Sequence, residues 1–393
     1  MSTFLSERAK SIKPSATLAV SAHAAQLRAQ GKNIISLSAG EPDFDTPAHI
    51  KSAAIEAINK GQTKYTAVDG TLELKQAIIN KFKRENSLTY EANQILVSCG
   101  AKHSLYNIFQ ATLNPDDEII IPAPFWASYP DMAKLSGAVP IIIKTTIDNN
   151  FKIDAYSLEK AISEKTRMFL LNSPSNPSGS NYTKSELREI SEVLLQHPKI
   201  LVVTDDIYEH IFWGSETFAN IINACEKLYE RTIVVNGVSK AYSMTGWRIG
   251  YTGGPEKIIK EMKKIQSQST SNPNSIAQAA AVSALNEKQD FIKDCVNTFK
   301  ERHDFLIDAL RKIDGISVLK SEGTFYSFPD MSNIISRFKS ISNDIELAQF
   351  FLDKAEVAMV PGSAFGVPGC MRISFATSMK NIKEGVKRIK NAL

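Results

Sequence analysis

The middle of the chain alternates between short, almost continuous apolar runs and longer amphipathic stretches. The apolar runs are rich in β-branched residues, and they begin at Ile95, Glu118, Val139, Arg167, Ile200 and Thr232. Patterns with helical spacing, such as SLYNIFQATL and KSELREISEVLLQH, stand between several of them. Apolar strands that alternate with helices are typical of a parallel sheet covered by helices on both faces. The sequence therefore predicts an α/β fold built on a mostly parallel sheet.

The C-terminal part of the chain has a different pattern. A long helical stretch covers about residues 283–312, and short apolar runs (ISVLK, TFYSF, VAMVP and MRISF) then return among helices. A chain of 393 residues is expected to form about two domains. We predict a large domain over residues 46–290 and a smaller α+β domain over residues 291–393. Residues 1–45 are predicted to form an N-terminal arm and part of the small domain.

Composition narrows the classes of partner and compartment. The formal net charge of +4 is spread without blocks, so it favours neither nucleic acid nor a membrane surface as a partner. The four cysteines are widely separated and the six histidines form no ligand motif, so we expect free thiols and no metal site. The N-terminus lacks a signal-peptide pattern, and no apolar run reaches the ~20 residues of a membrane helix. These features predict a cytoplasmic protein.

Small, polar or ionisable residues follow the predicted strands. CGAKHS follows ILVS, NSPSNPSG follows RMFLL, DDIYEH follows ILVVT, and GVSKAYSMTGWR follows TIVVN. Ligands of open parallel sheets bind beyond the carboxyl ends of the strands. We therefore expect these segments to converge on one crevice.

Two of these segments suit a phosphate group. Gly100, Ala101 and Lys102 open a helix, where backbone N–H groups and the helix dipole favour an anion. The alternative is an ordinary turn from strand to helix. Arg248 could donate a fork of hydrogen bonds to the same phosphate.

The other segments suit an aromatic, nitrogen-containing ligand. Asp205 ends a buried strand and needs a cationic partner there, and a protonated pyridine nitrogen would serve. Tyr208 could direct its hydroxyl at the same ligand, and Asn176 lies between two prolines, either as a fixed amide donor or only as a turn residue. Lys240 in such a cation-rich, semi-buried site would have a lowered pKa and act as a nucleophilic amine. Together these residues predict pyridoxal 5′-phosphate as the cofactor.

At these residues the chain resembles the class I aminotransferases of the pyridoxal-phosphate-dependent fold type I, and among them the bacterial-type aspartate aminotransferases. The similar segments, in family order, are KPSAT, SAGEPDFDTP, KYTAVDG, GAKHSLYN, PAPFWASYP, SPSNPSG, TDDIYEH, NGVSKAYSMTGWRIGY and MRISFAT. The resemblance implies ping-pong transamination of aspartate with 2-oxoglutarate to oxaloacetate and glutamate. Some members of this branch also convert prephenate to arogenate, and the sequence leaves open which amino-acid and oxo-acid pair is used.

The resemblance implies a role for each residue that faces the cofactor. Lys240 would be the Schiff-base lysine and would move the proton at the substrate Cα. Asp205 would pair with the pyridine nitrogen, while Tyr208 and Asn176 would hydrogen-bond the phenolic oxygen. Trp126 would stack on the ring, or it is simply a core aromatic. The residues that would surround the phosphate are Gly100, Ala101, Lys102 and Arg248.

The resemblance also implies a partner and a substrate clamp. Tyr65 would reach the phosphate of a neighbouring subunit, which makes the active unit a homodimer. Arg372 would hold the substrate α-carboxylate with the Gly40 N–H and Asn176, although an arginine on a short strand can also be a surface ion pair.

A dicarboxylic substrate needs a second cation. In other aspartate aminotransferases a long helix supplies a cross-subunit arginine, but residues 266–278 contain no cation here. The candidates are Lys102 and, on the N-terminal arm, Lys13 with hydrogen bonds from Thr17. The alternative is that Lys102 only neutralises phosphate and Lys13 is solvated.

Departures from the family pattern are Ala101 in place of a frequent glycine, Ala67 in place of the usual proline and, as a conservative change, Ser178 in place of threonine. We expect them to affect only the affinity for the cofactor and the rigidity of the loop that carries Tyr65. Two other functions stay open: a β-lyase or synthase on the same fold, and a regulator that only senses a ligand.

Overall fold

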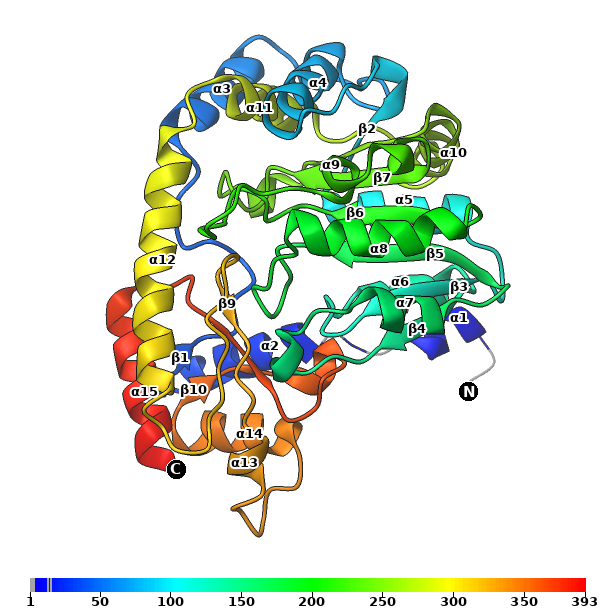
Figure 1. The fold of residues 1–393 in the computed structure, drawn as a ribbon. Helices are drawn as coiled ribbons and strands as arrows, with labels where there is room; N and C mark the ends of the chain where they lie inside the picture. Colours follow the sequence, from blue (N-terminus) through cyan, green and yellow to red (C-terminus); the bar gives the residue numbers. More distant parts are fainter. Residues whose placement is uncertain (1–3, 13, 15) are drawn as a thin grey trace.

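A computed structural model describes residues 4–12, 14 and 16–393 of the chain. Figure 1 shows a large domain around a central sheet and a smaller domain below it, with the long helix α12 (Asp290–Leu310) running beside both. In the residues described, no helix is long and apolar enough to cross a membrane.

The central sheet has the strand order β2-β8-β7-β6-β5-β3-β4. Its strands are β2 (Ile95–Ser98), β3 (Glu118–Pro122), β4 (Val139–Ile143), β5 (Thr166–Asn172), β6 (Leu201–Asp205), β7 (Thr232–Gly237) and β8 (Gly250–Gly253). Neighbouring strands from β4 to β7 pair in parallel, whereas β8 is antiparallel to both β7 and β2. The mostly parallel sheet is confirmed, and each of the six predicted apolar runs contributes a strand.

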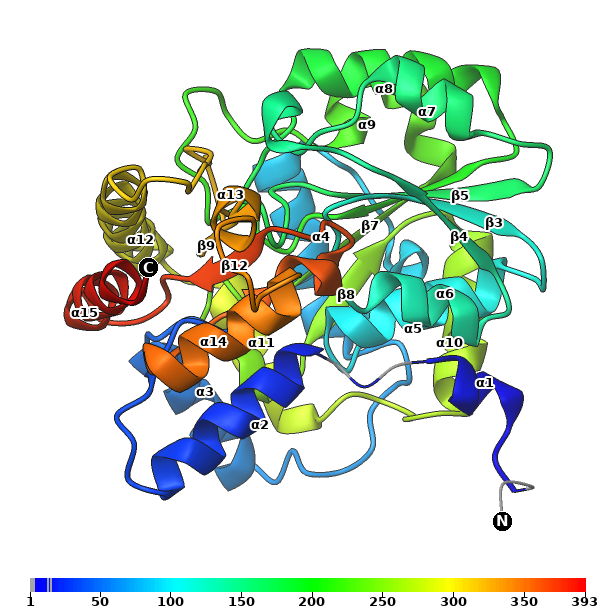
Figure 2. The same ribbon diagram turned by 90° about the horizontal axis from the view of Figure 1, so that it is seen from below.

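Helices cover both faces of this sheet (Figure 2). One face carries α5 (Ala101–Thr112), α6 (Tyr129–Leu135) and α10 (Glu256–Ser267), and the other carries α7 (Ala155–Ala161), α8 (Lys184–Gln196) and α9 (Ile221–Ala224). Successive strand residues alternate between these two cores: Val203 packs with α5, and Val202 packs with α8. Neighbouring residues at a strand end therefore face opposite layers.

A further helical layer lies beside the β2 edge. It consists of α3 (Ala48–Asn59), α4 (Leu72–Asn86) and α11 (Ser275–Asn286), and α11 packs on both of the others. The predicted helical stretch of residues 283–312 is wrong as one helix, because α11 ends at Asn286 and α12 begins at Asp290. The Gln289 side chain donates to the Ala284 and Glu287 carbonyls at 2.9 and 2.6 Å, which caps the end of α11 at this break.

The segment of residues 266–278 is likewise not one long helix. It includes the end of α10, a loop with Pro273, and the first turn of α11. The Asn274 side chain accepts a hydrogen bond from the Ala277 N–H at 2.9 Å and starts α11 there.

The small domain is α+β. Its strands are β9 (Tyr326–Ser327), β10 (Val357–Ala358), β11 (Val360–Pro361) and β12 (Met371–Ser374), and its helices are α12, α13 (Ser332–Ile335), α14 (Asp344–Lys354) and α15 (Met379–Ala392). Strand β12 pairs antiparallel with β9 and β11. Short 3₁₀ turns occur at Ala92–Gln94, Ile147–Asn149, Glu226–Arg231, Thr245–Trp247 and Gly362–Phe365.

The N-terminal arm contacts both domains. Strand β1 (Ile35–Ser36) pairs in parallel with β10, and α2 (Ala16–Ala29) packs on β10 and β11 of the small domain. Helix α1 (Glu7–Ser11) lies instead against α6 of the large domain. The arm therefore spans the boundary between the domains on the side where the strands of the central sheet end.

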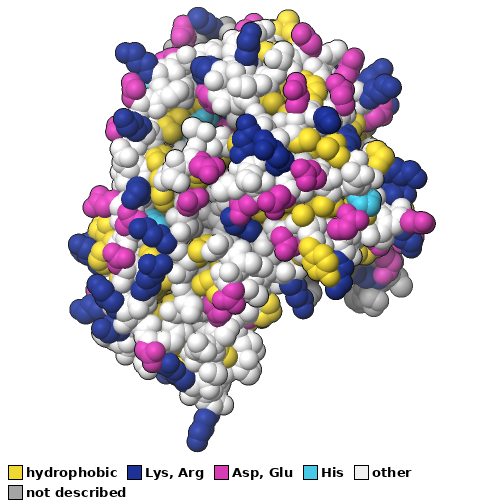
Figure 3. Space-filling view, in the orientation of Figure 1, with side chains coloured by type: hydrophobic (Ala, Val, Ile, Leu, Met, Phe, Trp, Pro, Cys, Tyr) yellow, Lys and Arg dark blue, Asp and Glu magenta, His cyan; other side chains and the backbone are white. Residues whose placement is uncertain are grey.

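The surface is mixed in charge. On the face shown in Figure 3, Lys and Arg side chains are intermingled with Asp and Glu side chains. Among the residues described, the most exposed large hydrophobic side chains include Tyr65 and Leu72, which are 92% and 74% exposed.

Candidate active site

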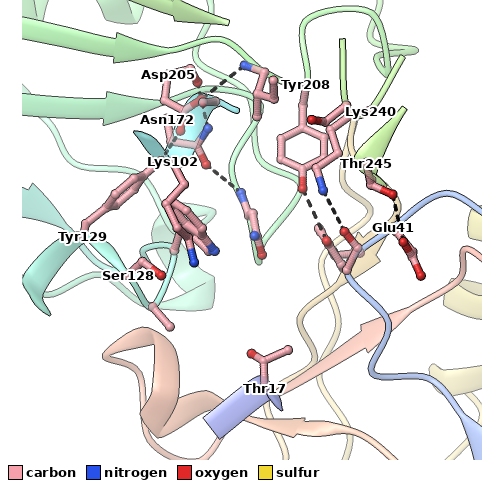
Figure 4. Close-up of a pocket in the computed structure, with 18 of the residues that line it drawn as sticks. Thr17, Glu41, Lys102, Ser128, Tyr129, Asn172, Asp205, Tyr208, Lys240 and Thr245 are labelled. Atoms are coloured by element: carbon pink, nitrogen blue, oxygen red, sulfur yellow. Dashed lines mark hydrogen bonds between the residues drawn. The ribbon is translucent and has the colours of Figure 1, made fainter. Parts of the chain in front are cut away.

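A cavity of about 410 Å³ lies beyond the carboxyl ends of β5, β6 and β7. Figure 4 shows Asp205, Asn172 and Tyr129 on one side of it, Tyr208 and Lys240 on the other, and Thr17 of α2 below. The predicted site residues that line the cavity are Thr17, Gly40, Ala101, Lys102, Trp126, Asn176, Asp205, Tyr208, Lys240, Arg248 and Arg372. The convergence of the strand-end segments on one crevice is therefore observed.

Lys240 follows β7 and directs its ammonium group toward the cavity. Its Nζ donates to the Gly40 carbonyl oxygen at 2.7 Å, so Gly40 meets the lysine through its carbonyl. Burial, and then the nearby Arg372 guanidinium, lower the pKa of Lys240 to about 8. Among the residues described, no carboxylate pairs directly with this amine, which leaves it available to a ligand.

Asp205, at the end of β6, presents its carboxylate on the α6 side of the sheet. The Tyr129 hydroxyl donates to its Oδ2 at 2.6 Å, and the Ile207 N–H donates to its Oδ1 at 3.3 Å. Burial raises the pKa of Asp205 to about 6, against the effects of the Tyr129 hydrogen bond and of Lys240. A nearby cationic ligand group would stabilise this carboxylate in its ionised form.

Asn172 was not predicted as a site residue, but it holds two site segments together. Its Nδ2 donates to the Asp205 carbonyl at 2.8 Å, and its Oδ1 accepts from the Asn176 N–H at 2.9 Å. Tyr129 was missed as well. It lies three residues after Trp126 in PAPFWASYP, and this helical spacing could have indicated a second aromatic facing the cavity.

One wall of the cavity has the features of an anion site. Gly100 has a φ of +90°, and a Cβ there would lie 2.3 Å from Arg248 Nη2. The Arg248 guanidinium donates to the Thr245 and Cys99 carbonyls at 2.9 and 3.3 Å, beside the first turn of α5. Gly250 also belongs here, because a Cβ on it would lie 2.1 Å from the Ala101 nitrogen. Because Gly250 has no side chain, the first residue of α5 can pack directly against β8.

Arg372 lies on β12 and is not a surface residue. It is 2% exposed, and its Nη2 donates to the Ser38 carbonyl at 2.9 Å. Nη1 donates to Asn176 Oδ1 at 3.2 Å, and Nε has no hydrogen-bond partner among the described residues. The alternative of a surface ion pair is therefore wrong, and a buried guanidinium with a free N–H beside a cavity suits a carboxylate.

The remaining predicted residues have different positions. The Lys102 ammonium lies 4.8 Å from the centroid of the Trp126 ring, and burial followed by Arg248 lowers its pKa. Tyr65 is exposed and does not line the cavity of its own chain. Lys13 lies outside the described residues.

Comparison with known proteins agrees with this geometry. Residues 32–389 match the family described as "Aminotransferase class I and II". The chain is 58% identical to the aspartate/prephenate aminotransferase of Nitrosomonas europaea over 99% of both chains. The crystal structure of the aspartate aminotransferase from Rhizobium meliloti matches with a TM-score of 0.95 and 47% identity, covering 99% of this chain and 98% of that one. The Thermus thermophilus aspartate aminotransferase with maleate matches with a TM-score of 0.93 and 38% identity, covering 99% of each chain.

Proposed function

Because this chain belongs to the class I and II aminotransferases, we propose that it transaminates aspartate with 2-oxoglutarate and uses pyridoxal 5′-phosphate to do so. We include prephenate, which would be converted to arogenate, as a further substrate, because the relative from Nitrosomonas europaea is named for it. Family membership confirms the fold type and the enzyme class that the sequence predicted. The observation that carries the proposal is the pair of Asp205 and Lys240, each without a charged direct partner among the described residues, on one cavity.

The cavity residues fit the cofactor. Asp205 would pair with the pyridine nitrogen, because burial makes its carboxylate costly without a cation. The start of α5 and the Arg248 guanidinium would hold the phosphate where Gly100 leaves room. Tyr208 and Asn176 would hydrogen-bond the phenolic oxygen, and Trp126 would cover the ring. When bound, pyridoxal phosphate supplies an aldehyde that exchanges with amino groups and a ring that withdraws electrons from the substrate Cα.

Lys240 is the proposed acid and base. With a pKa of about 8, part of its amine is neutral near neutral pH, and in this form it would hold the cofactor through its aldehyde or accept a proton from the substrate Cα. The Gly40 carbonyl, 2.7 Å from Nζ, holds the ammonium form at the cavity between these events.

Arg372 is the proposed holder of the substrate α-carboxylate, together with Asn176. Its free Nε and buried guanidinium support this, because a carboxylate would satisfy both the charge and the unpaired N–H. For the distal carboxylate we propose Lys102, with Thr17 and Lys13 of the arm. The Thermus thermophilus relative was solved with maleate, a dicarboxylate, which supports an acidic substrate.

We also propose that the active unit is a homodimer in which Tyr65 reaches the phosphate of the second copy. Tyr65 is 92% exposed on a single chain and does not line its own cavity, so its hydroxyl is available to a second copy. Mixing inactive Tyr65→Ala and Lys240→Ala chains should then give hybrids with one intact site and activity above both parents. Subunit exchange without any gain would place Tyr65 in its own chain's site.

A half-reaction screen tests the substrate. Purified enzyme is mixed with single amino acids while the visible band of the cofactor is followed, and aspartate and glutamate should convert it fully. The amino form should then be reoxidised to the aldehyde form by oxaloacetate, 2-oxoglutarate and prephenate. Release of pyruvate without amino transfer would indicate a lyase, and a spectral change without turnover would indicate a ligand sensor.

Lys102→Ser tests the acidic preference within the same screen. Loss of a charged hydrogen bond should weaken aspartate by ~1–3 kcal/mol and leave alanine or aromatic amino acids almost unchanged. Equal losses for acidic and neutral amino acids would contradict the role of Lys102.

A further inference from the structure

Tyr326 of β9 joins two groups of site residues. It is 1% exposed and lines the cavity, and its hydroxyl oxygen accepts a hydrogen bond from the Tyr208 hydroxyl at 3.3 Å. Its ring centroid lies 4.4 Å from the Arg372 guanidinium carbon. Tyr208 belongs to the large domain and Arg372 to the small domain, so Tyr326 contacts one proposed cofactor residue and one proposed substrate residue.

The strand pairing explains the contact with Arg372. In the β9–β12 pair, Tyr326 lies opposite Ser374, and Arg372 is two residues away on the same strand. Residues two apart on a strand face the same side, so Arg372 and Tyr326 are diagonal neighbours across the pair. Phe365 lies on the guanidinium as well, at 5.0 Å from its centroid to the same carbon. Two aromatic rings thus hold the plane of the guanidinium.

Contacts also restrict the position of the Tyr326 hydroxyl. Besides Tyr208, it approaches Gly40, where a Cβ would lie 3.5 Å from the Tyr326 oxygen. The Gly40 carbonyl also accepts the hydrogen bond from the Lys240 ammonium group. A buried hydroxyl that meets another hydroxyl across a domain boundary limits the directions in which both hydrogens can point.

We propose that Tyr326 is a positioning residue with two separable effects on transamination. Its ring orients Arg372 for the substrate carboxylate. In the loaded enzyme the direction of this hydrogen bond reverses: the Tyr326 hydroxyl donates to the Tyr208 oxygen, and the Tyr208 hydrogen is left for the phenolic oxygen of the cofactor. The proposal rests on the proposed function and adds a specificity and tuning residue to it.

Both effects can be measured apart from turnover. A stronger hydrogen bond from Tyr208 favours the ionised phenolic oxygen, so it lowers the pH at which the visible band of the bound cofactor changes. Carboxylate binding by Arg372 is measured as the dissociation constant of maleate from the loaded enzyme. Maleate is a dicarboxylate that cannot be transaminated.

The variants separate the ring from the hydroxyl. Tyr326→Phe removes the hydroxyl alone and should raise the spectral pKa by about 0.5–1 unit, while maleate affinity stays within threefold. Tyr326→Leu removes the ring as well and should weaken maleate by about tenfold relative to Tyr326→Phe. Tyr326→Met, which fills more of the volume without an aromatic face, repeats the second comparison if Tyr326→Leu folds poorly.

Tyr182→Phe is the matched control. Its hydroxyl is also buried, accepts a hydrogen bond from the Ile153 N–H at 2.9 Å and lies outside the cavity. This variant should change neither the spectral pKa nor the maleate constant.

Each half of the proposal can fail alone. An unchanged spectral pKa in Tyr326→Phe overturns the role of the hydroxyl. Equal maleate affinity in the Phe, Leu and Met variants overturns the role of the ring. A wild-type protein that shows no cofactor band and no amino transfer would instead overturn the proposed function itself, and with it the basis of this inference.

Discussion

Two lysines of the large domain have opposite electrostatic surroundings. Lys81 of α4 is 0% exposed, and its ammonium group bonds to the Glu209 carboxylate and, at 2.7 Å, to Asn86 Oδ1. Lys240 faces the cavity, and its hydrogen-bond partner is a neutral carbonyl, that of Gly40. One amine has its charge compensated within the chain, and the other is left for a ligand. The absence of a charged partner within the chain therefore identifies the reactive lysine better than its burial does.

The buried network of Lys81, Glu209 and Asn86 also supports the cavity that Lys240 faces. Glu209 directly follows Tyr208, and its Oε1 accepts from Asn236 Nδ2 at 2.6 Å, near the end of β7 that leads to Lys240. Asn86 of α4 donates to the other carboxylate oxygen at 2.6 Å. The ends of β6 and β7 are thereby fixed to α4. Hydrogen-bonded residues behind a site can hold its reactive side chains in place when those side chains have few hydrogen bonds of their own.

The largest effect is expected for Lys240→Ala. Turnover should be abolished, because the base at the cavity is lost and, among the described residues, no other amine is as well placed. The thermal unfolding midpoint, measured at fixed protein concentration without added cofactor, should change little, since no ion pair is broken. A variant that still cycles the cofactor between its aldehyde and amine forms at near-normal rate would contradict the role of Lys240.

Asp205→Asn should follow closely. Without a carboxylate the pyridine nitrogen would stay largely unprotonated, and the chemical step should slow by roughly a thousandfold or more, about 4 kcal/mol. Single-turnover kinetics with aspartate measure this directly. Asp206→Asn is the matched control one residue away, because Asp206 does not line the cavity. Comparable losses in both variants would contradict the assignment of the ring-facing carboxylate.

The central sheet could be predicted because its strands are apolar on both faces and read as runs. Strand β8 could not be, because its sequence is dominated by glycines that close packing requires. A Cβ on Gly253 would lie 2.7 Å from the Tyr90 ring, and Gly250 has a similar constraint against Ala101. A strand shaped by such contacts carries little strand propensity of its own.

The site divides in the same way. Residues that follow strands, such as Asp205 and Lys240, could be predicted from their place in the chain and their charge. Asn172 ends β5 and could have been found by the same rule, since it opens the segment NSPSNPSG. Tyr326 could not, because it is 118 residues from Tyr208 in sequence and reaches it only through the packing of two domains.

Lys81→Met tests the buried network. Removing the ammonium leaves the Glu209 carboxylate buried without its counter-ion, so the free energy of unfolding should fall by about 3 kcal/mol. Chemical denaturation of the wild type, of this variant and of Lys240→Ala, all without added cofactor, gives the comparison. The double variant Lys81→Met/Glu209→Gln removes both charges and should recover part of the loss. A Lys81→Met protein as stable as the wild type would show that the network does not hold α4 to the strand ends.

The smallest effect is expected for Asp206→Asn, which compares two neighbouring carboxylates on opposite faces of the sheet. Asp206 is 1% exposed, its Oδ1 accepts from the Thr204 hydroxyl at 2.5 Å, and its Oδ2 has no partner among the described residues. Burial, and then the nearby Glu209 charge, raise the pKa of Asp206 to about 8. Asp206 is therefore a neutral acid at neutral pH, and asparagine resembles that form.

The sign of the pH dependence follows from this raised pKa. Between pH 4 and 8 the folded state keeps a proton on Asp206 that the unfolded state has released. Its contribution to stability is complete below the unfolded pKa and is lost as pH rises through about 8. The free energy of unfolding of Asp206→Asn, measured against the wild type from pH 6 to 8, should therefore improve by up to about 1.4 kcal/mol per pH unit, with transamination unchanged within threefold. Parallel stability profiles would mean that Asp206 is ionised in the folded protein. The two carboxylates would then differ in the face they occupy and not in their charge.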